Sequence, residues 1–319
     1  MNGGLMAAPL SGTAPRIVVV GSTNTDLVVG VPHIPAPGET VLGGTMETVA
    51  GGKGANQAVA AARLGGDVTF VARVGDDAFG RNAVAGFARE NIDTRYVAVT
   101  PGVASGVALI AVREETGENS IVVAPGANAH LSPEDIDEAA PAFDGAQALI
   151  VSLEIPQETV ERAVEIAHAR GLAVILNPAP ARRLPPDLLE RVTVLTPNET
   201  EARQILGRPE DAEDVQTLAA DLLALGVGAA VVTLGAAGAL TATPDGIEHV
   251  PTRAVQAIDT TAAGDCFTGA LAVEFSGGRS LRDAVRFANA AAALSVTRPG
   301  AQPALPTRAE VEVFLLSRG

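Results

Sequence analysis

From about Leu149 to the C-terminus, short apolar runs of the chain alternate with amphipathic stretches. Such alternation is typical of strands that are joined by helices, which form a mostly parallel sheet with helices on both faces. The sequence therefore predicts an α/β fold. The expected strands are 148–152, 172–176, 192–196 and 229–234, and the expected helices are 158–170, 264–275, 281–296 and 307–316.

The first third of the chain follows a different pattern. Residues 26–31 and 39–49 are predicted to be short strands interrupted by prolines and glycines. Residues 105–112 and 121–124 form a second predicted pair around the polar turn 114–118. Neither pair has a helix beside it, so we expect one small antiparallel sheet that projects from the main domain. An uncovered apolar face on this sheet would cover a substrate, pair with another subunit, or do both.

Composition excludes several classes of partner and site. The formal charge of −15 argues against nucleic-acid and anionic-membrane surfaces, since both require basic patches. A single cysteine, Cys266, allows no internal disulfide and agrees with a reducing cytoplasm, and four scattered histidines offer no zinc-type cluster. No stretch is suited to span a membrane. We expect residues 1–15 to be a flexible extension without a signal-peptide pattern, and residues 16–319 to be a single cytoplasmic domain.

The segment Asp259-Thr-Thr-Ala-Ala-Gly-Asp265 leads into an apolar, helix-forming stretch. The first turn of a helix has unpaired N–H groups and a partial positive charge, which together bind anions. An aspartate at such a site can accept a proton from a hydroxyl while the N–H groups neutralise charge on a phosphate. This combination indicates phosphoryl transfer to an alcohol. The alternative is an ordinary helix start at which Asp265 only interacts with the helix dipole.

A second glycine-rich segment, Gly51-Gly-Lys-Gly-Ala-Asn-Gln57, precedes another alanine-rich helical run. Lys53 is the only lysine among the 22 basic residues of the chain. A lysine in a glycine loop lies close to the backbone and could donate to a sugar oxygen or a phosphate. The loop does not match the P-loop pattern. The alternative is a helix-entry turn in which the lysine has no special role.

Further polar residues follow other predicted strands, where ligands bind in open α/β sheets. Amide and carboxylate groups at these positions could hold sugar hydroxyls, and a carboxylate with an amide suits Mg²⁺ bound through water. Turn formation, helix capping and a hairpin turn are the ordinary alternatives. These candidates are Asn24 and Asp26, Glu154, Asn198 and Glu201, and the glycine-rich turn 233–238.

Together these motifs resemble those of the ribokinases within the PfkB-type carbohydrate kinase family, from about Arg16 to the C-terminus. Segments 51–58 and 259–265 resemble the two family signatures, and 198–201 resembles its metal-linked N-x-x-E motif. Segments 175–181 and 298–302 also match. The resemblance implies a three-layer α/β/α kinase domain with a mostly parallel sheet and a small antiparallel β lid. The lid would consist of about 26–49 and 105–124, and in this family it often makes a homodimer contact.

The resemblance also implies an activity, namely ATP-dependent phosphorylation of D-ribose at its 5-hydroxyl. Asp265 would be the base, and the N–H groups of Ala262, Ala263 and Gly264 would form the anion hole. The residues implied to hold ribose are Asn24, Asp26, Gly52, Lys53, Asn56 and Glu154. Those implied to contact ATP are Asn198, Thr233, Gly235, Gly238, Gly264 and Asn289, with Mg²⁺ near Asn198 and Glu201. The alternatives are a kinase for 2-deoxyribose, fructose or a nucleoside, and a non-catalytic sugar-binding regulator; the scarcity of aromatic residues disfavours the nucleoside.

Ribokinases are also similar in binding a monovalent cation, usually K⁺, beside the anion hole. The matching positions are the side chain of Asp259 and the carbonyls of Thr261, Ser295, Arg298 and Gly300. The family commonly has a further serine ligand where this chain has Ala304, so its cation shell is expected to lack one oxygen. Cys266 follows the proposed base where other members can carry threonine, and a small buried side chain is preferred here to a redox switch.

Overall fold

The computed structural model describes residues 13–209 and 214–317. Residues 1–12 of the expected extension lie outside the described residues. The centre of the molecule is a nine-stranded sheet with the order β13-β12-β11-β10-β9-β8-β1-β4-β5, in which all neighbours are parallel except β11–β12 and β12–β13. Its strands are β1 (Arg16–Val20), β4 (Asp67–Gly75), β5 (Asp93–Thr100), β8 (Ala148–Ser152), β9 (Ala173–Asn177), β10 (Val194–Leu195), β11 (Ala229–Thr233), β12 (Ala239–Thr243) and β13 (Gly246–Val250).

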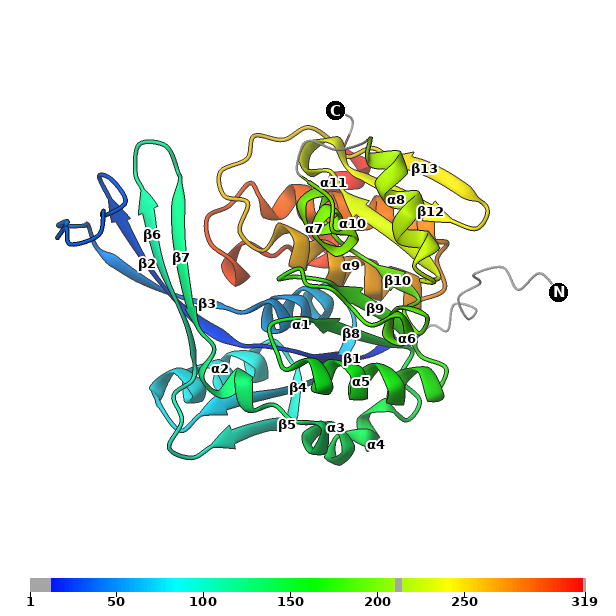
Figure 1. Cartoon of the computed structure of the whole chain (residues 1–319), viewed down its shortest axis with the longest axis horizontal. Coiled ribbons are helices and arrows are strands. Elements are labelled where there is room, and N and C mark those ends of the chain that lie inside the picture. The colour runs from blue at the N-terminus through cyan, green and yellow to red at the C-terminus, as the bar shows by residue number, and fades with distance from the viewer. Residues whose placement is uncertain (1–12, 210–213, 318–319) are drawn as a thin grey trace.

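Helices cover both faces of this sheet (Figure 1). Strand β1 shows why, because Ile17 and Val19 join one buried apolar cluster while Val18 and Val20 join the other, as the two-residue period of a strand requires. The first cluster includes residues of α1 (Lys53–Arg63), α2 (Ala78–Arg89), α9 (Ala263–Ser276), α10 (Leu281–Ser295) and α11 (Arg308–Leu316). The second includes residues of α3 (Pro133–Glu138), α4 (Ala140–Phe143), α5 (Gln157–Ala169), α6 (Pro186–Leu189), α7 (Glu199–Leu206) and α8 (Val215–Ala224).

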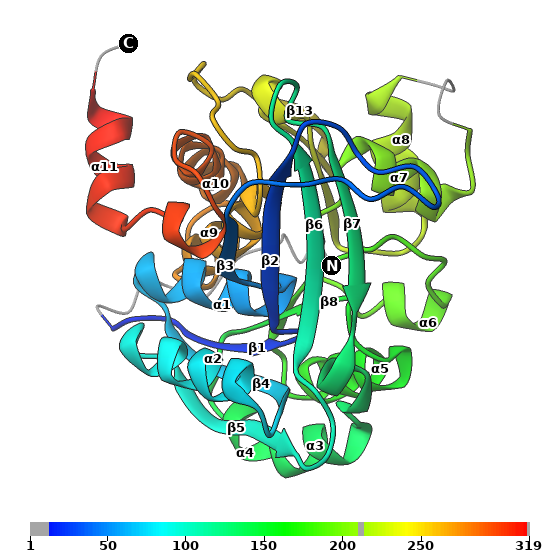
Figure 2. The same ribbon diagram turned by 90° about the vertical axis from the view of Figure 1, so that its left-hand side faces the viewer.

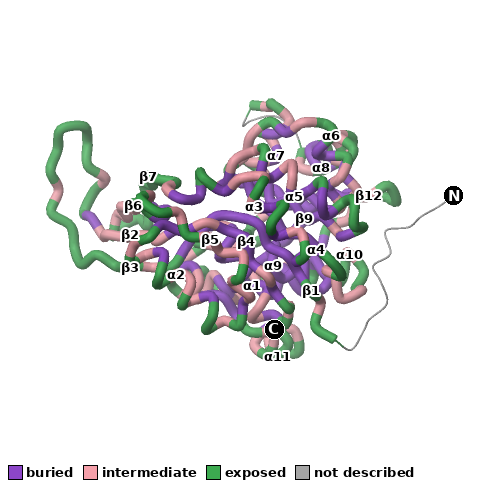
Figure 3. The backbone as a smooth tube through the Cα atoms, turned by 90° about the horizontal axis from the view of Figure 1, so that it is seen from below, coloured by how far each residue is buried: buried purple, intermediate pink, exposed green. Residues whose placement is uncertain are grey.

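A second, four-stranded sheet projects from the main body (Figures 1 and 2). It has the order β3-β2-β6-β7. The pairs β2–β3 and β6–β7 are antiparallel, as expected, and the central pair β2–β6 is parallel. Much of it is exposed, as the green outer part of the tube shows (Figure 3). The strands are β2 (Asn24–Val31), β3 (Met46–Gly51), β6 (Gly106–Arg113) and β7 (Asn119–Ala124).

The expected fold class is confirmed, and the expected strand at 39–49 is wrong for residues 39–45. Strand β3 begins only at Met46, because the two preceding glycines leave the ladder. The Gly44 N–H donates to the carbonyl of Gly30 at 2.8 Å, and a Cβ on Gly43 would lie 2.8 Å from that same oxygen. The described part of the chain also contains three short 3-10 helices: η1 (Gly126–His130), η2 (Gly235–Ala237) and η3 (Gln302–Ala304). No helix in the described ranges is both long and apolar enough to cross a bilayer.

Candidate active site

The candidate residues meet at one edge of the main sheet. Strands β1, β8, β9, β10 and β11 are parallel, so their carboxyl ends lie at the same edge. Helices α1 and α9, which carry the two glycine-rich signatures at their first turns, pack against each other on one face of this sheet. The residues that the strand ends place here include Ser22, Glu154, Asn177, Asn198 and Thr233.

Asp265 lies in the first turn of α9 and is 6% exposed. Its two carboxylate oxygens each accept one amide hydrogen bond, from Asn56 Nδ2 to Oδ2 and from Gln57 Nε2 to Oδ1, both 2.9 Å long. Burial raises the pKa of Asp265 above its ordinary value, although the charge of Lys53 and the two amides act in the opposite direction. The carboxyl group is thus held in a fixed orientation, and its pKa is shifted toward that of a proton acceptor useful near neutral pH.

Lys53 is the first residue of α1 and lies among carboxylates from three other elements. Burial alone would lower its pKa, but Asp265, Glu154 and Glu201 together hold the pKa above its usual value, so the side chain is a cation. The preceding residue, Gly52, has a φ of 89°, and a Cβ there would lie 2.6 Å from the backbone nitrogen of Asn24. A glycine is therefore required where the start of α1 meets the start of β2.

The residues expected to bind a sugar lie on the β2 side of Asp265. Ser22 Oγ and the backbone N–H of Lys53 both donate to Glu154 Oε2, at 2.6 and 3.1 Å. Asn128 Nδ2 donates to Asn24 Oδ1 at 2.7 Å, which fixes the amide of Asn24. Burial, with the nearby charges of Glu154 and Asp265, raises the pKa of Asp26 to about 6. These polar groups form a rigid set of acceptors and donors beside the carboxylate of Asp265.

The N-terminus of α9 opens onto a cavity of about 200 Å³. Ala262, which precedes the helix, has a left-handed φ of 61°. A Cβ on Gly264 would meet no atom within 4 Å, so the space in front of this turn is empty. The cavity is lined by residues from both signatures and from the ends of β9 to β11: Lys53, Asn177, Ala179, Thr196, Asn198, Glu201, Thr233, Thr260, Ala262, Ala263, Gly264 and Asp265.

Asn198 and Glu201 form a capping box at the start of α7. Asn198 Oδ1 accepts from the Glu201 N–H and Glu201 Oε2 accepts from the Asn198 N–H, both at 2.8 Å. The capping alternative is therefore present in the structure, but both residues also line the 200 Å³ cavity. Burial raises the pKa of Glu201, against the opposing effect of the Asn198 N–H and Lys53. The pair is thus both a helix cap and part of the cavity wall.

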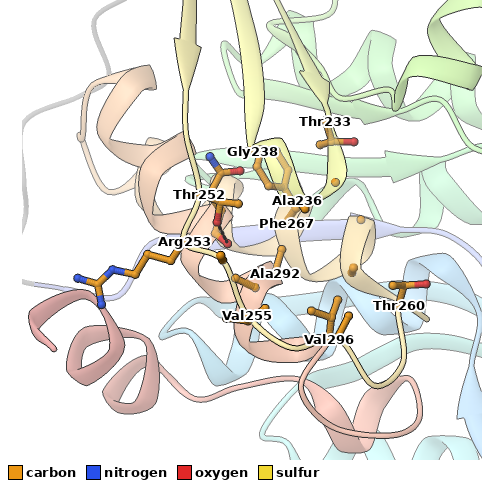
Figure 4. Close-up of a pocket in the computed structure, with 17 residues that line it drawn as sticks. Thr233, Ala236, Gly238, Thr252, Arg253, Val255, Thr260, Phe267, Ala292 and Val296 are labelled. Atoms are coloured by element: carbon orange, nitrogen blue, oxygen red, sulfur yellow. Dashed lines mark hydrogen bonds between the residues drawn. The ribbon is translucent and has the colours of Figure 1, made fainter. Parts of the chain in front are cut away.

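A second, more apolar cavity of about 330 Å³ adjoins the first (Figure 4). The two share Thr233, Thr260, Ala263 and Gly264 in their walls, so they adjoin at the start of α9. Three expected nucleotide contacts, Gly235, Gly238 and Asn289, also line it. Arg253 extends away from the cavity in Figure 4 and donates to the carbonyl of Phe314. The shape suits a flat apolar base in the second cavity with attached phosphates running toward Asp265.

The expected cation ligands also lie close together. Asp259 Oδ1 accepts from the Thr261 N–H at 2.9 Å, and its Oδ2 accepts from the Gly300 N–H at 2.8 Å. Burial acts to raise the pKa of Asp259, but these hydrogen bonds outweigh it, and the pKa is lowered. Ser295 is buried at the end of α10, and Arg298 pairs with Glu310. Within the described ranges, no group of three or more His, Cys, Asp or Glu side chains is arranged to hold a metal.

Cys266 follows Asp265 and is fully buried. Burial raises the pKa of its thiol to about 12. A protonated, inaccessible thiol is unreactive, which agrees with the expected role as a small buried side chain.

Among the residues that contact the expected site residues, Ser22, Gln57 and Asn128 were not candidates. Asn177 was not a candidate either; it accepts from Gln57 and lines the 200 Å³ cavity. Gln57 and Asn177 do lie in the segments that resemble the family, and Asn177 follows a predicted strand. Their positions in the sequence therefore indicated that they could belong to the site. The position of Asn128 gave no such indication, because it lies in η1 and reaches Asn24 only through a contact between residues 104 positions apart.

Comparison with known proteins gives a consistent assignment. The family described as pfkB family carbohydrate kinase matches residues 14–308. The ribokinase of Haemophilus influenzae is 42% identical over 94% of this chain and 98% of its own length. A deoxyribokinase of Salmonella typhimurium is 39% identical over 94% of this chain and 98% of its own length. The structure of Arabidopsis thaliana ribokinase complexed with ribose and ATP is similar, with a TM-score of 0.88, 34% identity, and coverage of 96% of this chain and 100% of that one. Because the family matches most of the chain, and a relative is 42% identical over 94% of it, this chain belongs to the pfkB family of carbohydrate kinases.

Proposed function

We propose that this chain is a ribokinase, which transfers the γ-phosphoryl group of ATP to the 5-hydroxyl of D-ribose and releases ribose 5-phosphate and ADP. One observation carries the proposal. The buried carboxylate of Asp265 stands between a set of polar sugar-side residues and an empty helix N-terminus that opens into an apolar cavity. Its relatives named ribokinase extend over almost the whole chain.

The geometry divides the chemistry among the residues. Asp265 accepts the proton of the ribose hydroxyl as that oxygen attacks phosphorus, and general-base catalysis of this kind contributes about 10²- to 10⁴-fold in rate. The N–H groups of Ala262, Ala263 and Gly264, with the Lys53 ammonium group, neutralise charge on the transferred phosphoryl group. ATP lies with its base in the 330 Å³ cavity, between Thr233 and Asn289, and with its phosphates in the 200 Å³ cavity.

The acceptor sugar lies among Asn24, Asp26, Asn56, Glu154 and the Gly52–Lys53 backbone. Asn56 supports this placement, because its Nδ2 is bonded to Asp265 while its Oδ1 is buried without a protein partner in the described structure. A buried acceptor without a donor is costly, and a sugar hydroxyl would satisfy it.

Metal ions complete the proposal. Asn198 and Glu201 fit Mg²⁺ held through water, because both residues line the phosphate cavity and hard oxygen donors suit this ion. Bound Mg²⁺ would neutralise phosphate charge. The ionised Asp259 and the carbonyls of Thr261, Ser295, Arg298 and Gly300 fit a monovalent cation such as K⁺. Ala304 supplies no side-chain oxygen, so we expect the K⁺ requirement to be weak.

We further propose that residues 16–319 form one cytoplasmic kinase domain, in which about 26–49 and 105–124 form a lid over the sugar. The lid would also join two copies in a homodimer. An acidic surface, with a formal charge of −15, leaves nucleic acid and anionic membranes outside the range of partners.

The reaction is tested by following ADP release with ribose, 2-deoxyribose and fructose, each with and without K⁺. We expect the highest kcat/KM with ribose. In parallel, Asp265→Asn should lower kcat by about 10³-fold or more while leaving the ribose KM nearly unchanged, because proton acceptance is lost together with one of the two amide hydrogen bonds to this side chain. Asp245→Asn, at the exposed turn between β12 and β13, is the matched control and should behave like the wild type.

Each alternative has its own outcome. Faster turnover of 2-deoxyribose than of ribose would assign the chain to the activity named for its deoxyribokinase relative. Ribose binding by calorimetry without any ADP formation would indicate the non-catalytic regulator. Near-normal kcat in Asp265→Asn would remove that residue from the role of base.

A further inference from the structure

A chain of buried amides connects the main sheet to Asp265. Asn177, the last residue of β9, donates from Nδ2 to the backbone carbonyl of Thr196 at 2.9 Å. Gln57 Nε2 donates to Asn177 Oδ1 at 3.1 Å and to Asp265 Oδ1 at 2.9 Å. Gln57 is 0% exposed, and Asn177 is 6% exposed. The two side chains therefore form a continuous hydrogen-bonded path, named here the amide chain, from the backbone of the sheet to the candidate base.

The backbone fixes the direction of every bond in the amide chain. A carbonyl oxygen can only accept, so Asn177 must turn its Nδ2 toward Thr196 and its Oδ1 toward Gln57. Gln57 must then present Nε2, and both hydrogens of that nitrogen are used, one for Asn177 and one for Asp265. Rotating the Gln57 amide by 180° would place its oxygen against two acceptor atoms, Asn177 Oδ1 and Asp265 Oδ1, and both hydrogen bonds would be lost. The pairing of β9 with β10, which continues in the Thr196 N–H bond to Leu176, thus determines what Asp265 meets.

We propose that Gln57 is a positioning residue for phosphoryl transfer, which holds Asp265 in the ionised form and in one orientation by a donor that the sheet backbone prevents from turning. The inference rests on the proposed function. Asn56 and Gln57 each have a buried amide oxygen without a protein partner in the described structure, Asn56 Oδ1 and Gln57 Oε1. The two differ in exposure, since Asn56 is 5% exposed and available to the sugar, whereas Gln57 is 0% exposed and wholly enclosed. Gln57 should therefore affect kcat and leave ribose binding unchanged.

Other charged groups also act on Asp265 and must be held constant in a test. Lys53 on α1 favours the ionised form, and Glu154 after β8 disfavours it. Asp26 on β2 and Glu201 on α7 interact with the same carboxylate, and Cys266 follows it on α9. None of these groups receives a hydrogen bond from Gln57 in the described structure, so changes confined to the Gln57 amide leave them in place.

The test compares Gln57→Met, which keeps the length of the side chain and removes the donor, with Gln57→Glu, which replaces it by a carboxylate. We expect Gln57→Met to lower kcat about 10- to 100-fold, the value of one lost hydrogen bond to a charged group, with the ribose and ATP KM values within about twofold. The midpoint of the kcat–pH profile should move upward, so that part of the loss is recovered at high pH. Gln57→Glu should be more severe than Gln57→Met, because it sets an acceptor against an acceptor.

A double-mutant cycle distinguishes positioning from a general structural role. In the Asp265→Asn background, adding Gln57→Met should change the residual rate less than about twofold, because the group that Gln57 holds is already absent. Equal proportional losses in both backgrounds, or a loss confined to the ribose KM, would overturn the proposal.

Folding is checked by thermal unfolding, and Asn177→Asp provides a second route if Gln57→Met does not fold. This variant can still accept from Gln57 but cannot donate to Thr196, and it should show the same non-additivity with Asp265→Asn. Additive losses there would also contradict the proposal. The sugar panel with the wild type separates the substrate proposal from the proposed role of Gln57. If the enzyme prefers another sugar, the substrate proposal fails. The double-mutant cycle, run with that sugar, still decides the role of Gln57.

Discussion

At the centre of the site, four carboxylates and one lysine lie close together, and their electrostatic interactions are partly unfavourable. Lys53 interacts with Asp265, Glu154 and Glu201, and Asp26 interacts with two of the same groups. Burial is the largest cause of the raised pKa values of Asp26, Glu201 and Asp265. Like charges at short range in a buried place oppose ionisation. The residues that suit binding and catalysis therefore reduce the stability of the empty site.

Asp26 gives the clearest pH dependence, since its pKa is raised to about 6 from 3.8. Between pH 7.5 and 5.5 its carboxylate gains a proton and loses part of its capacity to accept hydrogen bonds from the sugar. We expect the ribose KM to rise over this interval. In Asp26→Asn the KM should be high at every pH and nearly level. A slope identical to the wild type in that variant would show that another group is responsible.

The same shift predicts how Asp26 affects stability. The pKa is higher in the folded protein than in the unfolded chain, so the folded state favours the protonated form. The stabilising contribution of Asp26 is complete below about pH 4 and is lost as the pH rises through about 6. Asp26→Asn should therefore have a Tm near that of the wild type at pH 4 and a higher Tm at pH 7.5. Scanning calorimetry at both values checks this, and a lower Tm at pH 7.5 would contradict it.

At the scale of elements, α9 combines an open first turn with a tightly packed middle. Gly264 faces empty space, whereas a Cβ on Gly269 would lie 2.8 Å from the Cβ of Ala60 on α1. The first turn is thus free to receive an anion, and the middle of the helix is fixed against α1. Because α1 carries Lys53, Asn56 and Gln57, this close contact sets the distance between the two signatures.

Alanine at these two glycines should separate function from folding. Gly264→Ala places a methyl group in the space shared by the two cavities, so we expect a raised ATP KM and a kcat at least about tenfold lower. Its Tm should be unchanged or higher, since alanine favours a helix over glycine by about 1 kcal/mol. Gly269→Ala, the matched control on the same helix, should lower the Tm instead. Normal ATP kinetics in Gly264→Ala would argue against phosphate binding at this turn.

The elements were largely predictable from the sequence, whereas their mutual contacts were not. The predicted strand 148–152 coincides with β8, and the predicted helix 281–296 differs from α10 by one residue. Hydrophobic periodicity is a local property, so it finds such segments without knowing their neighbours. The amide chain joins residues 120 and 208 positions apart, and only the packing of α1 against the sheet and α9 brings them together. The predicted strand 39–49 was too long at its start, because Gly43 and Gly44 lie outside β3 although the residues around them favoured a strand.

At the scale of the whole molecule, the four-stranded sheet has two different faces. Residues paired across strands share a face, so the register places Asp26, Ala108 and Val123 on one side and Leu27, Leu109 and Val122 on the other. Under the proposed function, Asp26 places the first face on the sugar side. The second face points away from it, and Leu109 and Val122 there are 53% and 63% exposed. Exposed apolar side chains that lie side by side are typical of an interface.

If the second face, which carries Leu109 and Val122, joins two copies of the chain, then a charged residue on that face should separate them. We expect Val122→Lys and Leu109→Lys to convert a dimer to a monomer by light scattering coupled to gel filtration. Ile121→Lys is the control, because the register places Ile121 on the sugar face. That variant should remain dimeric and show a raised ribose KM. A monomeric wild type would refute the proposed assembly, and dissociation by Ile121→Lys alone would assign the interface to the opposite face.

The composition of the chain gives Lys53 a further property. It is the only lysine among 319 residues, and it lies in the buried centre of the site, where the charges of three carboxylates favour its protonated form. Acetylation, succinylation or an amine-directed crosslinker therefore finds a single lysine side chain in the whole protein, and reaction there removes the positive charge that interacts with Asp265, Glu154 and Glu201. Amine-directed labelling of this protein therefore has only the Lys53 side chain and the α-amino group as targets, so intact-mass measurement together with one peptide map reads out the occupancy of Lys53.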